Sequence, residues 1–278
     1  MNARLLFILL LFTIGALWYI IGYWRRKAGE AAFAAARLTE KSEERERYCR
    51  LAVIAGHREA CRMFCLLHPE RFDGHSPHKP FKLRGIRISF YGYYYPSRYN
   101  ALLNDEQRAF CHSIYQFKQG DIHGIEFFKT CMNALQLKKR PYHIMFMPCS
   151  NWIKYGQRFK RLDWYIGKHR QDLTSGLYDV DICDARESLH EAKGGEKRIL
   201  ERNYLITGKI KGKEIIIIDD VLTTGQSVVD YKEEIERCGG KVVAAIFYGK
   251  TLSMPSMLLV QIHVWGNHIA HIIERMTK

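Results

Sequence analysis

The run of residues 215–227 constrains the fold of this chain more than any other segment. It consists of four isoleucines, two aspartates, an apolar pair and the sequence Thr-Thr-Gly-Gln-Ser. Because the isoleucines are apolar on both faces of a strand, we predict a strand that is buried in a sheet and ends before Asp219. The apolar spacing of residues 228–237 then predicts a helix. A strand, a short loop and a helix start bring several unpaired backbone N–H groups to one point, which favours a phosphate site.

The side chains that follow this predicted strand suit a phosphorylated sugar. Carboxylates accept hydrogen bonds from neighbouring hydroxyl groups, while hydroxyls, backbone N–H groups and a permissive glycine can surround an oxyanion. The competing interpretation is a strand–turn–helix corner in which the aspartates only cap the helix. The two interpretations differ in whether the loop binds a ligand.

The order of residues in 215–227 resembles the signature with which type I phosphoribosyltransferases bind 5-phosphoribosyl 1-pyrophosphate (PRPP). The resemblance implies an α/β fold with a mainly parallel sheet, in which Asp219 and Asp220 bind the ribose hydroxyls and Asp220 is the candidate catalytic residue. It also implies a Mg²⁺ ion that bridges the pyrophosphate and the ribose close to both aspartates. The residues implied to bind the 5′-phosphate are Thr223, Thr224, Gly225, Gln226 and Ser227.

Three further segments resemble the ComF-type branch of that family more loosely. Residues 114–121 carry an aromatic residue, a lysine and Gly-Asp before a helical pattern. The strand predicted at residues 142–147 is followed by Pro148, and type I enzymes bind pyrophosphate with the loop after this strand. We expect backbone N–H groups of Cys149, Ser150 and Asn151 to serve this purpose. Residues 152–170 contain six basic residues and one acid, which indicates either a solvated basic helix or a surface for pyrophosphate or nucleic acid.

The polar stretch of residues 184–203 lies where type I enzymes have a loop that closes over the active site. Such a lid would shield an oxocarbenium-like transition state from water. The candidate lid residues are Arg186, Lys193, Lys197 and Arg202. A disordered surface loop is the competing interpretation.

Strands are also predicted at residues 86–90, 178–182, 241–248 and 258–265, with a short helix at residues 267–276. Their alternation with helical patterns favours an α/β sheet that is mainly parallel.

The beginning of the chain has the pattern of a membrane anchor. Residues 5–24 are almost wholly apolar, with aromatic residues at their end and Arg-Arg-Lys directly after them. We therefore predict a single transmembrane helix in residues 1–27, with the catalytic domain on the cytoplasmic side and the lipid bilayer as a partner. A cleavable signal peptide is the competing interpretation.

The remaining chain divides into three predicted segments. Residues 28–68 have helical spacing and include a stretch similar to one unit of a Sel1-like repeat. Residues 69–84 are rich in proline and histidine and are predicted as a linker. Residues 85–278 form the predicted phosphoribosyltransferase-like domain.

A formal net charge of +14 favours phosphate-rich ligands, nucleic acid or an anionic membrane as partners, without choosing among them. Two functions follow from the resemblance. The first is Mg²⁺-dependent transfer of a phosphoribosyl group to or from a nitrogenous base, with release of pyrophosphate. The second is a membrane-tethered accessory protein that binds PRPP or DNA without turnover. The sequence identifies neither the base nor an oligomeric state.

Overall fold

The computed structural model describes residues 3–122, 124–182 and 203–277, with side chains from Leu10 onward. The chain folds into two compact units. The helical unit comprises residues 1–74, 99–103 and 253–278, and the sheet unit comprises residues 75–98 and 104–252. The last segment of the chain thus belongs to the unit formed by its first segment.

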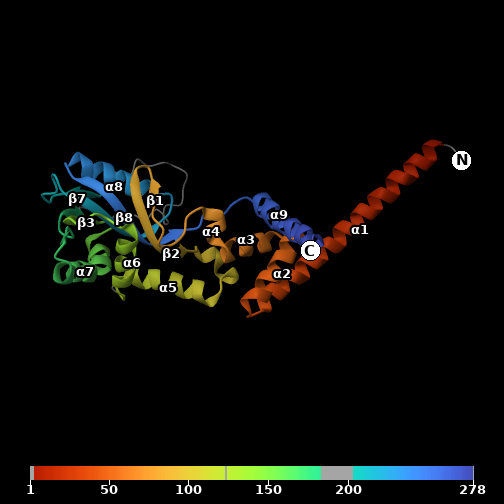
Figure 1. The fold of residues 1–278 in the computed structure, drawn as a ribbon, viewed down its shortest axis with the longest axis horizontal. Helices are drawn as coiled ribbons and strands as arrows, with labels where there is room; N and C mark the ends of the chain where they lie inside the picture. The colour runs from red at the N-terminus through yellow and green to blue at the C-terminus, as the bar shows by residue number, and fades with distance from the viewer. Residues whose placement is uncertain (1–2, 123, 183–202, 278) are drawn as a thin grey trace. The chain divides into compact units, whose positions relative to one another are not determined.

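The sheet unit is built on six strands in the order β1-β2-β8-β7-β3-β4 (Figure 1). Strands β1 and β2 form an antiparallel hairpin, and every other neighbouring pair in this sheet is parallel. This confirms the predicted α/β fold with a mainly parallel sheet. The bounds are β1 Phe81–Leu83, β2 Ile86–Tyr94, β3 Tyr142–Phe146, β4 Leu173–Ser175, β7 Glu214–Leu222 and β8 Lys241–Thr251. Strands β5 Val180–Ile182 and β6 Tyr204–Ile206 pair separately and antiparallel.

Helices cover both faces of the sheet, with α8 on one face and α5, α6 and α7 on the other (Figure 1). The isoleucines of β7 are completely buried between them, as their apolar run predicts. On one face, Phe117 of α5 and Phe127 of α6 both pack against Tyr248 of β8. The bounds are α5 Asp105–Gln119, α6 Ile125–Leu135, α7 Trp152–His169 and α8 Gln226–Arg237, with a 3₁₀ helix, η1, at Ser97–Leu102.

The prediction that the central strand ends before Asp219 is wrong. Strand β7 continues to Leu222, because β8 extends beside it and pairs Leu222 with Lys250. Ladder hydrogen bonds to a long neighbouring strand outweigh the weak strand propensity of aspartate. The two aspartates therefore lie on a rigid strand instead of a loop.

The helical unit consists of α1 Ala3–Leu38, α2 Ser42–Ile54, α3 Arg58–Leu67, α4 Pro69–Asp73 and α9 Met257–Met276. Helices in residues 28–68 were predicted and are confirmed, while their relation to a Sel1-like repeat stays a prediction. The predicted linker at residues 69–84 contains α4 and β1.

The strand predicted at residues 258–265 is wrong, because this segment belongs to α9. Its fully buried residues, Val260 and Val264, are four apart and so share one helical face. Ser256 caps the helix by accepting a hydrogen bond from the Leu259 N–H at 3.4 Å. Helix α9 packs on α2 and α3. The strand prediction rested on the apolar composition of the segment alone and took no account of this packing.

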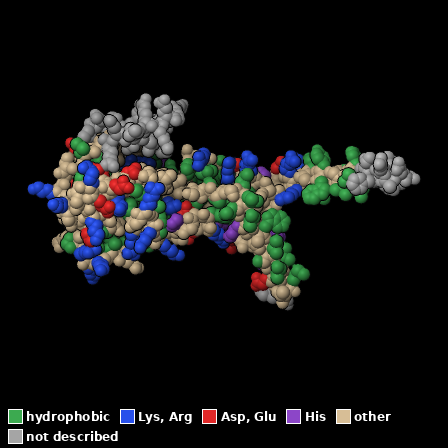
Figure 2. Space-filling view, turned by 90° about the horizontal axis from the view of Figure 1, so that it is seen from above, with side chains coloured by type: hydrophobic (Ala, Val, Ile, Leu, Met, Phe, Trp, Pro, Cys, Tyr) green, Lys and Arg blue, Asp and Glu red, His purple; other side chains and the backbone are tan. Residues whose placement is uncertain are grey.

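Large apolar side chains between Leu10 and Trp24 are exposed along α1 (Figure 2). Across the residues with described side chains, which begin at Leu10, no helix combines the length and apolarity needed to cross a membrane. The anchor predicted for residues 1–27 stays a prediction.

Candidate active site

Two loops open at the same edge of the sheet, because β3 and β7 are parallel neighbours with Phe146 beside Ile218. The pairing continues one residue further, where the Met147 N–H donates to the Ile218 carbonyl at 2.9 Å. The chain then runs through residues 149–151 into α7, while β7 runs through its aspartates towards α8. The predicted pyrophosphate loop and the predicted ribose-binding acids therefore meet at the carboxyl ends of the strands.

The 223–227 loop turns from β7 into α8 at Gly225. This residue has φ +79°, and a Cβ atom there would collide with the side chain of Leu83, so the position requires glycine. Thr223, Thr224 and Ser227 are exposed, and the first turn of α8 contains no acidic residue. The Gln226 N–H donates to Oγ1 of Thr224 at 3.4 Å. Exposed hydroxyls thus lie at the positive end of α8, an arrangement that favours a phosphate.

Asp220 is held by two basic residues from different helices. Its Oδ2 atom lies 2.6 Å from Nη1 of Arg158, on α7, and 3.5 Å from Nζ of Lys118, on α5. Asp219 accepts a hydrogen bond from the backbone N–H of Asp220 at 2.7 Å and lies 3.6 Å from Arg158. Two adjacent carboxylates are thus compensated by two cations.

The pKa of Asp219 is raised to about 7, first by burial and then by the charge of Asp220, while Arg158 opposes the shift. The pKa of Cys149 is raised to about 12, mainly by burial, and both aspartates add to this shift. The thiol of the loop after β3 therefore lies within electrostatic range of the acid pair.

Close approach of α5 and α7 brings Lys118 and Arg158 together. Gly120 ends α5 with φ +80°, and a Cβ atom there would collide with the backbone oxygen of Gln157 on α7. Only glycine allows the two helices to meet this closely. The Gly-Asp turn after the lysine, noted in residues 114–121, is thus the feature that positions the lysine.

Lys118 was noted only as part of residues 114–121. Arg158 was one of the six basic residues of 152–170, for which a surface for pyrophosphate or nucleic acid was one of two interpretations, and neither residue was singled out for the site. A signal for Arg158 was present in the sequence, because Tyr155, Phe159 and Leu162 form the buried face of α7 and residue 158 falls within the same helical spacing. Only 15% of the Arg158 side chain is exposed. A basic residue on an apolar face needs an acidic partner, whereas most of the other basic residues of α7 are exposed.

The loop after β3 is fixed by two asparagines. Asn151 caps α7 by accepting a hydrogen bond from the Lys154 N–H at 2.9 Å. Asn203 donates its side-chain N–H groups to the carbonyls of Cys149 and Ser150, at 3.2 and 3.4 Å. The predicted pyrophosphate loop, residues 149–151, is therefore fixed in place by these hydrogen bonds. The predicted lid residues Arg186, Lys193, Lys197 and Arg202 lie outside the described residues.

Comparison with known proteins agrees with this geometry. Residues 171–251 match the family described as "Phosphoribosyl transferase domain". Over 57 residues the chain is 42% identical to an orotate phosphoribosyltransferase of Sulfolobus acidocaldarius, covering 20% of this chain and 26% of the relative. The chain thus spans about a quarter of the curated relative that it matches. The segment that is similar to phosphoribosyltransferase domains contains β7, the acid pair, the 223–227 loop and β8.

Proposed function

We propose that the sheet unit binds PRPP and transfers its phosphoribosyl group to a nitrogenous base, or catalyses the reverse reaction. The observation that carries this proposal is the acid pair on β7. Asp220 pairs with Arg158 and Lys118, and the hydroxyl-bearing loop at the start of α8 follows the pair along the chain. The family match of residues 171–251 supports phosphoribosyl transfer in general, while the base and the metal dependence belong to the proposal.

The ribose and its 5′-phosphate would bind along the end of β7. Carboxylate oxygens of Asp219 and Asp220 accept hydrogen bonds from the 2′- and 3′-hydroxyls, and such bonds to charged groups are stronger than neutral ones. The N–H groups of the 223–227 loop and the positive end of the α8 dipole bind the phosphate. Arg84 donates to Gln226 at 2.8 Å and adds a positive charge beside this loop.

Arg158 and Lys118 would bind the pyrophosphate end of PRPP. In the structure they neutralise the aspartates, and Nε of Arg158 has no hydrogen-bond partner among the described residues. During transfer, the bond from C1′ to the pyrophosphate oxygen breaks, a bond from C1′ to the base nitrogen forms, and the departing pyrophosphate carries away the bonding electrons. Fixed cations beside this oxygen stabilise its developing charge.

The acid pair fits Mg²⁺ only as an ion that arrives with the substrate. Among the described residues, no three His, Cys, Asp or Glu side chains converge on a metal position. Mg²⁺ commonly binds through one or two carboxylates together with substrate phosphates and water. Asp219 and Asp220 can supply these carboxylates. When bound, the ion would neutralise charge on the pyrophosphate.

A pyrophosphate-release assay tests this proposal. The full-length chain is incubated with PRPP, Mg²⁺ and a panel of bases that includes orotate. We expect release with at least one base, and a large loss of activity in Asp220→Asn. Asp105→Asn serves as the control, because this side chain is 97% exposed at the start of α5.

Two outcomes would contradict the proposal. One is the absence of pyrophosphate release with every base. The other is DNA binding that falls steeply with salt and survives Asp219→Asn with Asp220→Asn, which would favour the accessory protein.

A further inference from the structure

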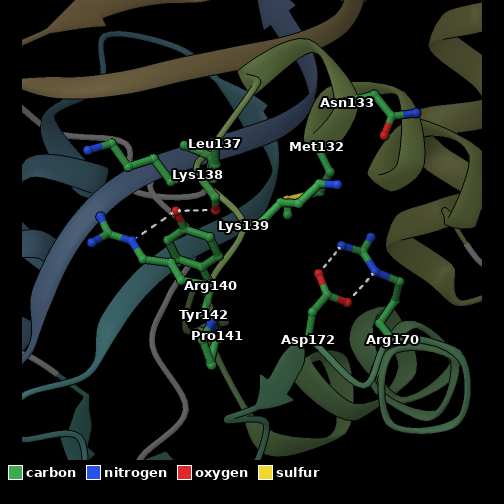
Figure 3. A pocket seen from close by; sticks show the side chains of 10 residues that line it. All are labelled: Met132, Asn133, Leu137, Lys138, Lys139, Arg140, Pro141, Tyr142, Arg170 and Asp172. Atoms are coloured by element: carbon green, nitrogen blue, oxygen red, sulfur yellow. Dashed lines mark hydrogen bonds and ion pairs between the residues drawn. The ribbon is translucent and has the colours of Figure 1, made fainter.

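Arginine, aspartate and tyrosine side chains around the cavity at the start of β3 and β4, of about 500 Å³, bind partners in their own chain (Figure 3). Arg170 donates two hydrogen bonds to Asp172, at 2.8 and 2.7 Å. The Tyr142 hydroxyl donates to the Lys138 carbonyl at 3.0 Å and accepts from Nε of Arg140 at 3.3 Å. Because these groups satisfy one another, the cavity specifies no ligand. The exposed face of α9 is the stronger indication of a partner.

Helix α9 carries an apolar stripe on the face that its own chain leaves exposed. The side chains of the stripe are between 40% and 81% exposed, and they are Leu258, Ile262, Trp265, Ile269, Ile272 and Met276. Successive members are alternately four and three residues apart. The buried Val260 and Val264 lie on the opposite side of the helix, which packs on α2 and α3.

The alternation of four and three residues is the heptad repeat of a coiled coil. An average spacing of 3.5 residues keeps the apolar side chains on one seam when helices supercoil around each other, whereas a straight helix has 3.6 residues per turn. The stripe fills three successive pairs of core positions, close to the length at which this pattern indicates a coiled coil. Ile262 and Ile269 occupy the a positions, where β-branched residues suit two-stranded coiled coils. The pattern therefore indicates that the partner is another helix.

The second half of α9 lacks the packing that usually stabilises a helix. From Trp265 to Met276, every residue except His268 is exposed. Helical segments of this length are marginal in water unless an apolar face is packed against something, and Gly266 weakens the helix further. A partner that covers the apolar stripe would supply the missing stabilisation.

The charge of α9 favours a second copy of this chain as the partner. The net charge of +14 makes two copies repel each other. Helix α9, however, contains no Asp, Glu, Lys or Arg from Met257 to Ile273, so two copies can meet along this helix without bringing like charges together. A helix that lies on a membrane surface is instead typically rich in Lys and Arg on its polar face. Identical stripes on two copies also suit a two-fold symmetric interface.

We propose that two copies of this chain associate through a coiled coil of their α9 helices, with the apolar stripe as its core. The interface belongs to the helical unit, and none of its residues is part of the acid pair or the 223–227 loop. The inference therefore goes beyond the proposed transfer reaction and does not depend on it.

Sedimentation equilibrium of the full-length chain over a range of concentrations tests the proposal. We expect a mass of twice the 32.6 kDa of one chain at high concentration. Ile269→Ala with Ile272→Ala should raise the dissociation constant of the dimer at least about tenfold, because the seam loses buried apolar groups while alanine preserves the helix. Asn267→Ala with His271→Ala is the matched control, at exposed positions on the opposite side of the same stretch, and should leave the dissociation constant unchanged.

Hydrogen exchange provides a second measurement that is specific to α9. The amides of residues 265–276 should be protected at concentrations where the dimer forms and should exchange quickly after dilution. In Ile269→Ala with Ile272→Ala, the same protection should require a higher concentration. Protection of α2 and α3 in every variant shows that the helical unit is folded.

A monomer at every concentration would overturn the proposal. A dimer with the same dissociation constant in the wild type and in Ile269→Ala with Ile272→Ala would also overturn it, because the contact would then lie elsewhere in the chain. A third contrary result is binding to vesicles of phosphatidylcholine and phosphatidylserine that this double substitution abolishes without changing the mass, which would assign the stripe to a membrane surface. PRPP binding is measured separately, so failure of this proposal is distinguishable from failure of the transfer reaction.

Discussion

Arg158 connects the acid pair to α7 through an ion pair with the buried Asp220. Its guanidinium lies 2.6 Å from Asp220, and both side chains are at least 85% buried. Removing one partner of such a pair leaves an uncompensated charge. The same cation is proposed to receive pyrophosphate, so a single substitution affects both stability and binding.

We predict that Arg158→Ala lowers the free energy of unfolding by about 3 kcal/mol and weakens PRPP binding at least about tenfold. Urea denaturation and calorimetry measure the two effects. Lys160→Ala, an exposed position on the same helix, should change neither quantity. An Arg158→Ala variant as stable as the wild type would show that the ion pair does not stabilise the fold.

His143 on β3 gives the sheet unit a dependence on pH. Its ring is buried and bonded to Thr174 and Asp179, both at 2.7 Å. Its pKa is lowered, first by burial and then by the charge of Lys213, against the opposing effect of Asp179. Below a pH of about 6.5 the unfolded chain therefore binds more protons at this residue than the folded chain does.

The expected consequence is that stability falls as the pH decreases below about 6.5, and that this fall is smaller in His143→Gln. Denaturant unfolding at pH 5.5, 6.5 and 7.5 compares the two proteins. If the variant loses as much stability on acidification as the wild type, the assignment of this pH dependence to His143 is wrong.

At the scale of elements, the turn between β7 and α8 positions the groups that we propose to bind phosphate. We predict that Gly225→Ala both destabilises the sheet unit and abolishes PRPP binding, because it combines a left-handed φ with a collision at Leu83. Gly212→Ala is the matched control, since Gly212 has φ +77° but open space around its Cβ position. Thermal unfolding should distinguish the two variants, with the larger loss of stability in Gly225→Ala. Equal losses would mean that the contact with Leu83 is unimportant.

Much of the sheet, and the acid pair and turn of the candidate site, could be predicted from the sequence, because their signals are local. Four consecutive isoleucines specify a buried strand, and Thr-Thr-Gly after two acids specifies the turn. What could not be predicted depends on partners distant in sequence. The end of β7 depends on the length of β8, and α9 depends on the surface offered by α2 and α3.

The other half of the site was missed for the same reason. Lys118 and Arg158 lie about a hundred and about sixty residues before the aspartates that they contact. Only the approach of α5 to α7 at Gly120 brings these charges to one place. Helical spacing on α7 could have indicated that Arg158 faces inward, but not which acid it meets.

At the scale of the whole molecule, the site and the last helix belong to different compact units. We predict that Val260→Asp, which buries a carboxylate against α2 and α3, destabilises the helical unit by several kcal/mol and leaves PRPP affinity within about twofold. Ile262→Asp, at a neighbouring exposed position, should destabilise much less. Limited proteolysis and calorimetry provide the two measurements. A large loss of PRPP affinity in Val260→Asp would show that the units are coupled.

The central claim is that Asp219 and Asp220 form part of a PRPP site, and calorimetric titration of PRPP into the full-length chain, with and without Mg²⁺, tests it most directly. We predict saturable binding to the wild type that strengthens with Mg²⁺, and binding at least about tenfold weaker in both Asp219→Asn and Asp220→Asn. No binding by the wild type, or equal affinity in the wild type and both variants, would contradict it.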